Sequence, residues 1–259
     1  MFENLPIIPL RGLVVFPLQT ALFDISRAGS LLALEQAMDE QKRVFLAAQR
    51  DTSVENPHIE DLYSVGTVAR VRQIMRMPDG ALRLLVSGER RALLVELEEH
   101  GNFAMAHIAP MAICRLEDER VRRAHARVLR GLVRDLNRQT DALTSEALNM
   151  IVGEKDAVVM GDIAAAHVLG ALEDKQELLE CRDEEERLQL LEHKLSEELQ
   201  IVKLERDIQS KVSATIEQHN KDYYLREQIR AIHEELGDTE ENELEAFRKQ
   251  LSDSALPPG

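Results

Sequence analysis

Glycine and proline are missing from a long part of this 259-residue chain, and several other residue types are scarce. Neither occurs in the 66 residues from Ala171 to Leu236, so that the residues that most readily stop a helix are absent there. Fully helical, this stretch would be about 100 Å long at roughly 1.5 Å per residue, which exceeds the width of a small globular domain. A helix of that length connects other parts of a protein and does not by itself form an active site.

Cysteine is also scarce, with Cys114 and Cys181 far apart in the sequence. A disulfide scaffold needs more cysteines and a zinc site needs closer spacing, so we expect two free thiols in a reducing compartment. No apolar stretch approaches the roughly 18 residues of a membrane span. The N-terminus lacks a basic region followed by an apolar one, as a signal peptide would have. These features predict a cytoplasmic protein without a membrane partner.

Aromatic residues make up 3% of the chain, tryptophan is absent, and the net charge is −15. Residues 1–110 carry a charge of −3 and residues 111–259 a charge of −12, so the acidity is concentrated in the C-terminal part. An acidic surface with few aromatic side chains repels phosphate backbones. Nucleic acid is therefore not an expected partner.

The first part of the chain has the pattern of a β-rich lobe. Val14–Phe16 suit a strand, which the neighbouring prolines place at an edge or a bend. The strongest local signal is a long hairpin over residues 65–97, in which Pro78 and Gly80 supply the turn and Gly80 provides a positive φ. Further expected elements are a helix over 26–39 with Ser26 as its N-cap, strands over 44–48 and 103–111, and a surface loop over 51–61.

Beyond Pro110 the pattern becomes helical. We expect helices over residues 117–139, 144–152 and 162–172, the last with Asp162 as its N-cap. The long stretch that follows has two apolar stripes that drift and do not keep a heptad, so we expect it to pack first on its own bundle and later on a partner. The stripes are Leu188, Leu191, Leu195, Leu199 and Val202, and Ile201, Leu204, Ile208, Val212 and Ile216.

The expected fold class is α+β, with a small twisted β-barrel-like lobe that includes one helix, then an α-helical bundle that ends in a very long helix. The expected domains are a β-rich lobe over 1–112, a helical bundle over 113–180, a long helix or coiled-coil-like stalk over 181–237 and an acidic tail over 238–259.

No pattern for catalysis or cofactor binding is present. The chain has no phosphate-binding loop, dinucleotide fingerprint, nucleophile elbow or His-Glu-x-x-His helix. The acidic run Asp183–Glu186 is better explained by a helix N-terminus than by a metal ion. Eight arginines between Arg115 and Arg138 make one helix basic; a solvated helix that meets the acidic long helix is favoured over a nucleic-acid face. We therefore expect no catalytic, cofactor-binding or metal-binding residue.

Four apolar residues are candidates for contact with a substrate. Met75 and Met77 lie at the end of the hairpin, where alternation predicts that they share the face of Val71, and methionine adapts to varied apolar ligands. Leu18 and Leu22 offer a similar apolar edge. For both pairs, ordinary core packing is the favoured interpretation and recognition is the alternative.

Several motifs occur in one order along the chain. Tyr223 to Gly237 reads Tyr-Tyr-Leu-x-Glu-Gln-x-x-x-Ile-x-x-Glu-Leu-Gly, and earlier motifs occupy residues 5–11 with 14–17, 35–39, 45–50 and 61–69. This set resembles the Lon family of ATP-dependent proteases, in which the Tyr-Tyr signature lies just ahead of the ATPase module. The resemblance covers most of the chain and suggests that it is the N-terminal region only.

The resemblance implies a parent enzyme that forms a ring of six, unfolds damaged or regulatory proteins with ATP and Mg in its ATPase module, and cuts them in a serine–lysine protease domain. It implies that the present region captures unfolded proteins and supports self-association, without cofactor or catalysis of its own. Two alternatives remain: a freestanding module that binds RNA or a regulatory protein, which salt-dependent binding would reveal, and a coiled-coil adaptor that forms oligomers without binding unfolded proteins.

Overall fold

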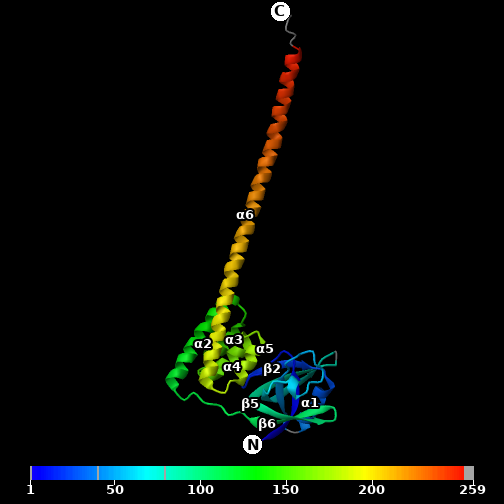
Figure 1. The fold of residues 1–259 in the computed structure, drawn as a ribbon, viewed down its shortest axis with the longest axis vertical. Coiled ribbons are helices and arrows are strands. Elements are labelled where there is room, and N and C mark those ends of the chain that lie inside the picture. Colours follow the sequence, from blue (N-terminus) through cyan, green and yellow to red (C-terminus); the bar gives the residue numbers. More distant parts are fainter. Residues whose placement is uncertain (1, 40, 79, 254–259) are drawn as a thin grey trace, which may run out of the picture. The chain divides into compact units, whose positions relative to one another are not determined.

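The computed structural model describes residues 2–39, 41–78 and 80–253, except for the side chains of 236–242 and 251–253. The chain divides into two compact units, residues 1–202 and 203–259. The first unit contains a β-sheet lobe and a bundle of helices that lie beside each other (Figure 1). The predicted α+β fold class is therefore confirmed. Asp79 of the expected turn and residues 254–259 of the expected acidic tail lie outside the described residues.

One mixed sheet forms the β lobe. Its strand order is β2-β5-β4-β3-β1-β6, and β5 also pairs with β6. Strand β5 pairs with β4 over residues 82–93 and with β6 over residues 92–100, and the two pairings overlap at Ala92 and Leu93. The lobe is barrel-like but is not a closed barrel. The strands are β1 (Glu3–Leu10), β2 (Thr20–Ile25), β3 (Arg43–Ala48), β4 (Val65–Arg76), β5 (Leu82–His100) and β6 (Phe103–Pro110).

The first strand does not lie where the sequence predicted it. It occupies Glu3–Leu10, and Pro6 and Pro9 fit within it because its first half pairs with β6 and its second half with β3. The expected strand at Val14–Phe16 is wrong, although all three side chains are buried. Val14 and Phe16 pack in the core of the helical bundle and Val15 in the core beneath the sheet. Their apolar character reflects burial outside a strand.

Helix α1 (Ala28–Asp39) packs on the sheet, with Ala33, Leu34 and Ala37 in the shared core. Its first intrahelical hydrogen bond runs from the amide of Leu31 to the carbonyl of Arg27, at 3.0 Å. Arg27 therefore occupies the N-cap position. Ser26, the predicted N-cap, lies one residue too early.

Gly88 of β5 lies against the backbone of the segment before β2. A Cβ atom added there would be 2.2 Å from the carbonyl oxygen of Phe16, and hydrogen bonds to Leu18 and Gln19 hold the two segments together. We therefore expect Gly88→Ala to lower the free energy of unfolding by about 1–3 kcal/mol through overpacking, as measured by urea denaturation. Gly131→Ala is the control, because a Cβ atom at that helical position meets open space. Equal losses in the two variants would contradict this explanation.

The bundle contains more helices than the sequence predicted. They are α2 (Glu119–Thr140), α3 (Ser145–Gly153), α4 (Ala157–Val168), α5 (Leu172–Glu180) and α6 (Glu184–Asp253). The first two were expected. The third expected helix exists but not with the expected bounds of 162–172, since α4 spans Ala157–Val168. Its N-cap is Asp156, so the predicted cap Asp162 is wrong and lies inside the helix.

The stretch without glycine or proline is not one helix. It breaks at Cys181–Asp183, and α6 then continues past Gly237 to Asp253, beyond the expected end of the long helix. Side chains replace the missing helical hydrogen bonds at the break. Asp183 accepts from the amides of Glu185 and Glu186 at 2.9 and 3.0 Å and so caps α6. The acidic run therefore lies at a helix N-terminus, as predicted.

Two arginine side chains donate hydrogen bonds to carbonyl groups at the C-terminal end of α5. Arg91 of β5 donates to the carbonyls of Leu179 and Cys181 at 3.0 and 2.5 Å. Arg187 of α6 donates to the carbonyl of Leu178 at 2.8 Å and forms an ion pair with Asp162 of α4. Burial lowers the pKa of Arg91 to about 10, with a further contribution from the neighbouring charge of Arg187. This cluster ties the β lobe to the helical bundle.

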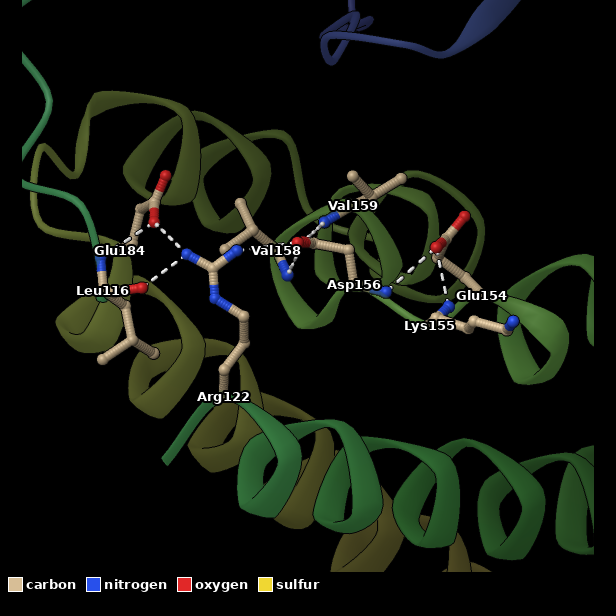
Figure 2. Close-up of polar contacts among 8 residues, drawn as sticks. All are labelled: Leu116, Arg122, Glu154, Lys155, Asp156, Val158, Val159 and Glu184. Carbon is tan, nitrogen blue, oxygen red and sulfur yellow. Dashed lines mark hydrogen bonds and ion pairs between the residues drawn. The ribbon is translucent and has the colours of Figure 1, made fainter. Parts of the chain in front are cut away.

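The side chain of Arg122, in the first turn of α2, contacts the segment that precedes α2 and the N-terminal ends of α4 and α6 (Figure 2). It donates to the carbonyl of Leu116 and forms ion pairs with Asp156 at 2.7 Å and with Glu184 at 3.3 Å. Glu184 also accepts from the amide of Leu116, at 2.9 Å. Three helix starts are therefore held by one side chain.

Asp156 combines this ion pair with the capping of α4. Its Oδ1 accepts from the amides of Val158 and Val159 at 2.8 and 3.1 Å (Figure 2). Burial alone would raise the pKa of Asp156, but the hydrogen bonds from Val159, Arg122 and Val158 outweigh it and the pKa is lowered. A lowered carboxyl pKa means that the charged form stabilises the folded state above about pH 4. That contribution is lost as the pH falls through the lowered pKa.

We accordingly expect Asp156→Ala to lower the free energy of unfolding by about 1–2 kcal/mol at pH 7, the usual range for loss of an N-cap. The difference from the parent should shrink towards pH 3, and urea denaturation at both pH values would measure it. Asp118→Ala is the matched control, because Asp118 caps α2 through one amide, that of Arg120. A difference that grows on acidification would show that the charged carboxylate does not stabilise the fold.

Helix α6 has two different parts. Up to Val202 it belongs to the first unit, and its first apolar stripe is buried there from Leu188 to Val202, as predicted. The second stripe lies mostly beyond this point and is exposed: Leu204, Ile208, Val212 and Ile216 are each 51–60% accessible.

Candidate functional site

A tight turn before β2 holds an apolar side chain in solvent. The amide of Gln19 donates to the carbonyl of Phe16 at 3.3 Å, and the Gln19 side chain accepts from the amide of Phe16 at 2.9 Å. Within this turn Leu18 follows Pro17 with a φ of 58° and is 63% exposed. Proline followed by a positive φ is typical of a type II turn, in which glycine is the usual residue. A leucine at this position is therefore strained as well as exposed.

Leu22 is a second exposed apolar residue and lies on β2. It pairs across the strands with Leu85 of β5, and Leu85 pairs in turn with Gln73 of β4. Paired residues lie on the same face of a sheet, so Leu22 and Leu85 lie side by side on the face opposite the buried Leu84. Leu22 is 53% exposed and Leu85 is half-buried.

A β-bulge places Met75 on that same face. The register of β4 against β5 shifts between Val71 and Gln73, so Arg72 is the extra residue and the alternation of side chains reverses. Val71 pairs with the buried Val86, whereas Met75 pairs with Arg83. The prediction that Met75 shares the face of Val71 is therefore wrong. Met75 is half-buried on the outer face, two positions along β4 from Gln73.

Met77 lies at the hairpin turn, where its amide donates to the carbonyl of Ala81 at 2.9 Å and its side chain is half-buried. Gly80 has the expected positive φ, 88°. The turn thus has the predicted glycine geometry, and Met77 lies at the end of the two strands that carry Met75 and Leu85.

We call Leu18, Leu22, Met75 and Leu85 the exposed apolar edge. Sequence reasoning missed Leu85, although Leu84 and Leu85 are adjacent and alternation requires one of them to face outward. A polar pair interrupts the edge: Arg83 binds both oxygens of Asp24 at 2.7 and 2.8 Å. These hydrogen bonds lower the pKa of Asp24 and keep it charged.

The exposed apolar edge suits weak and adaptable binding. It has a flexible methionine and three leucines and contains no nucleophile. Surfaces of this kind accept varied apolar partners, whereas a deep pocket with fixed polar groups selects one. The arrangement is therefore one for recognition.

The basic helix predicted between Arg115 and Arg138 only partly meets acidic residues of α6. Arg122 contacts Glu184 and His125 contacts Glu192 at 2.8 Å. Arg120, Arg127 and Arg134 are exposed, and within the part of the chain that the structure describes they form no ion pair.

No group of three or more His, Cys, Asp or Glu side chains among the described residues could hold a metal ion. Cys114 and Cys181 are free thiols. None of the described helices combines the length and the apolar composition that a membrane crossing requires.

Comparison with known proteins gives consistent matches. The family model of the ATP-dependent protease La (LON) substrate-binding domain matches residues 4–197. Lon protease of Brevibacillus choshinensis is 35% identical over 257 residues, which are 98% of this chain and 33% of that protein. Lon protease 1 of Bacillus subtilis strain 168 is 31% identical over 260 residues, again 98% and 33%. The chain thus spans about a third of the length of these relatives.

Solved structures agree with the fold. The N-terminal domain of Mycobacterium avium complex Lon protease has a TM-score of 0.61 at 19% identity, and the match covers 75% of this chain and 98% of that one. A Lon N-terminal domain protein from Xanthomonas campestris has a TM-score of 0.53 at 19% identity, with 73% and 96% covered. At this identity the two structures support the fold alone.

Proposed function

The chain belongs to the family of Lon substrate-binding domains, and from this premise we propose that it captures unfolded or damaged polypeptides for an ATP-dependent serine protease. The parent would unfold and cut misfolded and regulatory proteins with ATP and Mg bound in a separate ATPase module. This chain would bind and present them without catalysing either step. The two free thiols fit a reducing compartment, and we place the protein in the cytoplasm.

The exposed apolar edge is the observation that carries this proposal. Unfolded chains differ from folded ones chiefly in the apolar side chains that they expose. A receptor for many such chains needs apolar surface that stays in water and adapts to different partners. Leu18, Leu22 and Met75 have these properties, and we propose Met77 as a further contact at the hairpin turn.

Helix α6 supplies a second surface, which we propose for self-association in a homohexamer. In the second unit of the chain, α6 exposes apolar side chains that only a partner could bury. We further propose that residues 1–112 recognise substrates, that 113–180 brace this lobe, and that 181–237 and the tail 238–259 lead to the ATPase module. The exposed apolar residues of the second unit include Leu204, Ile208, Val212, Ile216, Tyr223, Tyr224, Leu225, Ile229 and Ile232.

Binding to one model protein in two states tests the function. The 259-residue chain should bind a reduced and permanently unfolded polypeptide, measured by fluorescence anisotropy, and should bind the folded form of the same polypeptide much more weakly. Equal binding of both forms, or of neither, would contradict the proposal. Self-association without binding of the unfolded form would support a coiled-coil adaptor, and binding of RNA that weakens with salt would support a nucleic-acid module.

A further inference from the structure

A polar cavity lies on the β lobe, and its lining includes none of the four residues of the exposed apolar edge, although Asp24, which interrupts that edge, belongs to it. It has a volume of about 130 Å³ and is lined by the ends of β1 and β2 and by the start of α1. A water molecule occupies roughly 30 Å³ in the liquid, so the cavity has room for a small polar group. Its lining includes two arginines, Arg11 and Arg27, and the hydroxyl-bearing Ser26 and Ser30.

Both arginines donate to neutral acceptors. Arg27 donates to the carbonyls of Glu55 and Pro9 at 3.0 and 3.3 Å and to the side-chain oxygen of Gln49 at 2.6 Å. Arg11 donates to the carbonyl of Val54 at 3.1 Å. A guanidinium has five N–H donors, so each arginine retains donors beyond these bonds. Neither forms an ion pair with a carboxylate within the described ranges.

The acidic groups nearby compensate this charge only in part. Asp24 lines the cavity but is bound at both oxygens by Arg83. Burial lowers the pKa of Arg27, the charge of Arg11 lowers it further, and Glu55 opposes them. Two like charges therefore lie near each other at a cavity, and an anion placed there would be attracted to both.

The start of α1 adds donors without partners. Ser30 is 95% buried and lines the cavity, and its hydroxyl has no hydrogen-bond partner among the residues described. The N-cap residue, Arg27, has no side-chain acceptor to offer the first turn. Of the first three residues of α1, Ser30 lines the cavity, and its amide has no backbone or side-chain acceptor in the described structure. Free amides at a helix start favour a negatively charged ligand.

We propose that this cavity, which we call the α1 cavity, binds an oxyanion, a phosphate or carboxylate group, through Arg11, Arg27 and the hydroxyl and amide of Ser30. Charge-assisted hydrogen bonds from arginine suit such groups. The same chemistry has two sources: free inorganic phosphate, or the terminal carboxylate of a bound polypeptide. This proposal does not depend on the exposed apolar edge. If the α1 cavity binds no anion, the proposed capture of unfolded chains is not affected.

Titration of the ¹⁵N-labelled chain with inorganic phosphate at constant ionic strength tests the site. The amide signals of Ala28, Gly29 and Ser30 should shift with saturation. Arg11→Gln should weaken this binding about tenfold, the effect of losing one hydrogen bond to a charged group. Arg11 is exposed, so the variant should keep the parent spectrum elsewhere. Arg127→Gln is the matched control, because it removes the same charge from the exposed face of α2.

A pair of short peptides separates the two sources. One has a free terminal carboxylate and the other has the same sequence with an amidated end. Shifts at the α1 amides with the free peptide alone would identify a polypeptide terminus as the ligand, and shifts with phosphate alone would identify a free phosphate; either supports the site. Absence of shifts at these amides with both anions, or equal weakening by Arg127→Gln and Arg11→Gln, would overturn it.

Discussion

Replacing Arg187 with methionine is expected to lower the free energy of unfolding by about 3–5 kcal/mol, the range found when one partner of a buried ion pair is removed. Arg187 and Asp162 are 5% and 6% exposed. The variant keeps much of the apolar stem of the side chain but leaves the Asp162 carboxylate buried without its closest partner. It also removes the donor to the carbonyl of Leu178 at the end of α5. Urea denaturation at pH 7 would measure the loss.

Two further variants identify the cause of that loss. Arg134→Met makes the same change on the exposed face of α2 and should alter stability by less than about 0.5 kcal/mol, as is usual for surface positions. Adding Asp162→Asn to Arg187→Met should recover part of the loss, since the buried charge disappears. If the double variant is no more stable than Arg187→Met alone, the unpaired carboxylate is not the main cause.

The pH dependence of the Arg187→Met loss provides a separate check. Burial raises the pKa of Asp162, and the charges of Arg187 and Arg91 oppose this rise. Without Arg187 the folded-state pKa should rise further. A carboxyl group with a raised pKa in the folded state destabilises the fold when it ionises. The loss should therefore be larger at pH 7 than at pH 5, where more of the folded variant has a protonated Asp162.

Regular elements of this fold follow from local patterns, and the departures from them depend on long-range contacts. Alternation predicted the β4–β5 hairpin, and the Pro–Gly turn predicted the positive φ of Gly80. The helix break at Cys181–Asp183 contains no glycine or proline, and its local signal is the acidic run Asp183–Glu186, which predicted a helix N-terminus but not the contacts that hold the break. The break is stabilised by Arg91, which is about ninety positions away in the sequence. A local reading of the chain cannot anticipate that contact.

Asp162 illustrates the same limit. An aspartate before an apolar run predicts an N-cap, and Asp156, six residues earlier, is the true cap of α4. The two residues are chemically identical, and their roles are set by which of them Arg187 or Arg122 reaches. Paired charges buried between helices leave no periodic signal in a sequence.

Local patterns predicted only part of the exposed apolar edge. Leu18 and Leu22 were named from their position after Pro17, and both are exposed. Met75 was named for its adaptable side chain but was assigned to the wrong face, because a single extra residue at Arg72 reverses the alternation of β4. The bulge explains why Met75 lies beside the leucines of β2 and β5. Without it, the edge would lack a methionine.

The paired substitution Leu22→Asp and Met75→Asp should weaken the binding of an unfolded polypeptide about tenfold or more. Each change removes apolar contact area, and burial of a leucine or methionine side chain contributes up to about 1.5–3 kcal/mol. A loss of roughly 1.4 kcal/mol corresponds to tenfold in the dissociation constant. Both side chains lie on the outer face of the sheet, so the variant should keep the urea midpoint of the parent. Fluorescence anisotropy with the same unfolded polypeptide would give the ratio.

Val95→Asp is the matched control. Val95 is apolar and, like Leu22, 53% exposed, but it lies on β5 outside the exposed apolar edge. The variant adds one negative charge to the same lobe, so a general electrostatic effect on an acidic chain would weaken binding here too. Binding that falls equally for Val95→Asp and for Leu22→Asp alone would show that capture does not depend on this edge. A loss confined to Leu22 and Met75 would instead assign capture to the outer face of the sheet that the bulge at Arg72 completes.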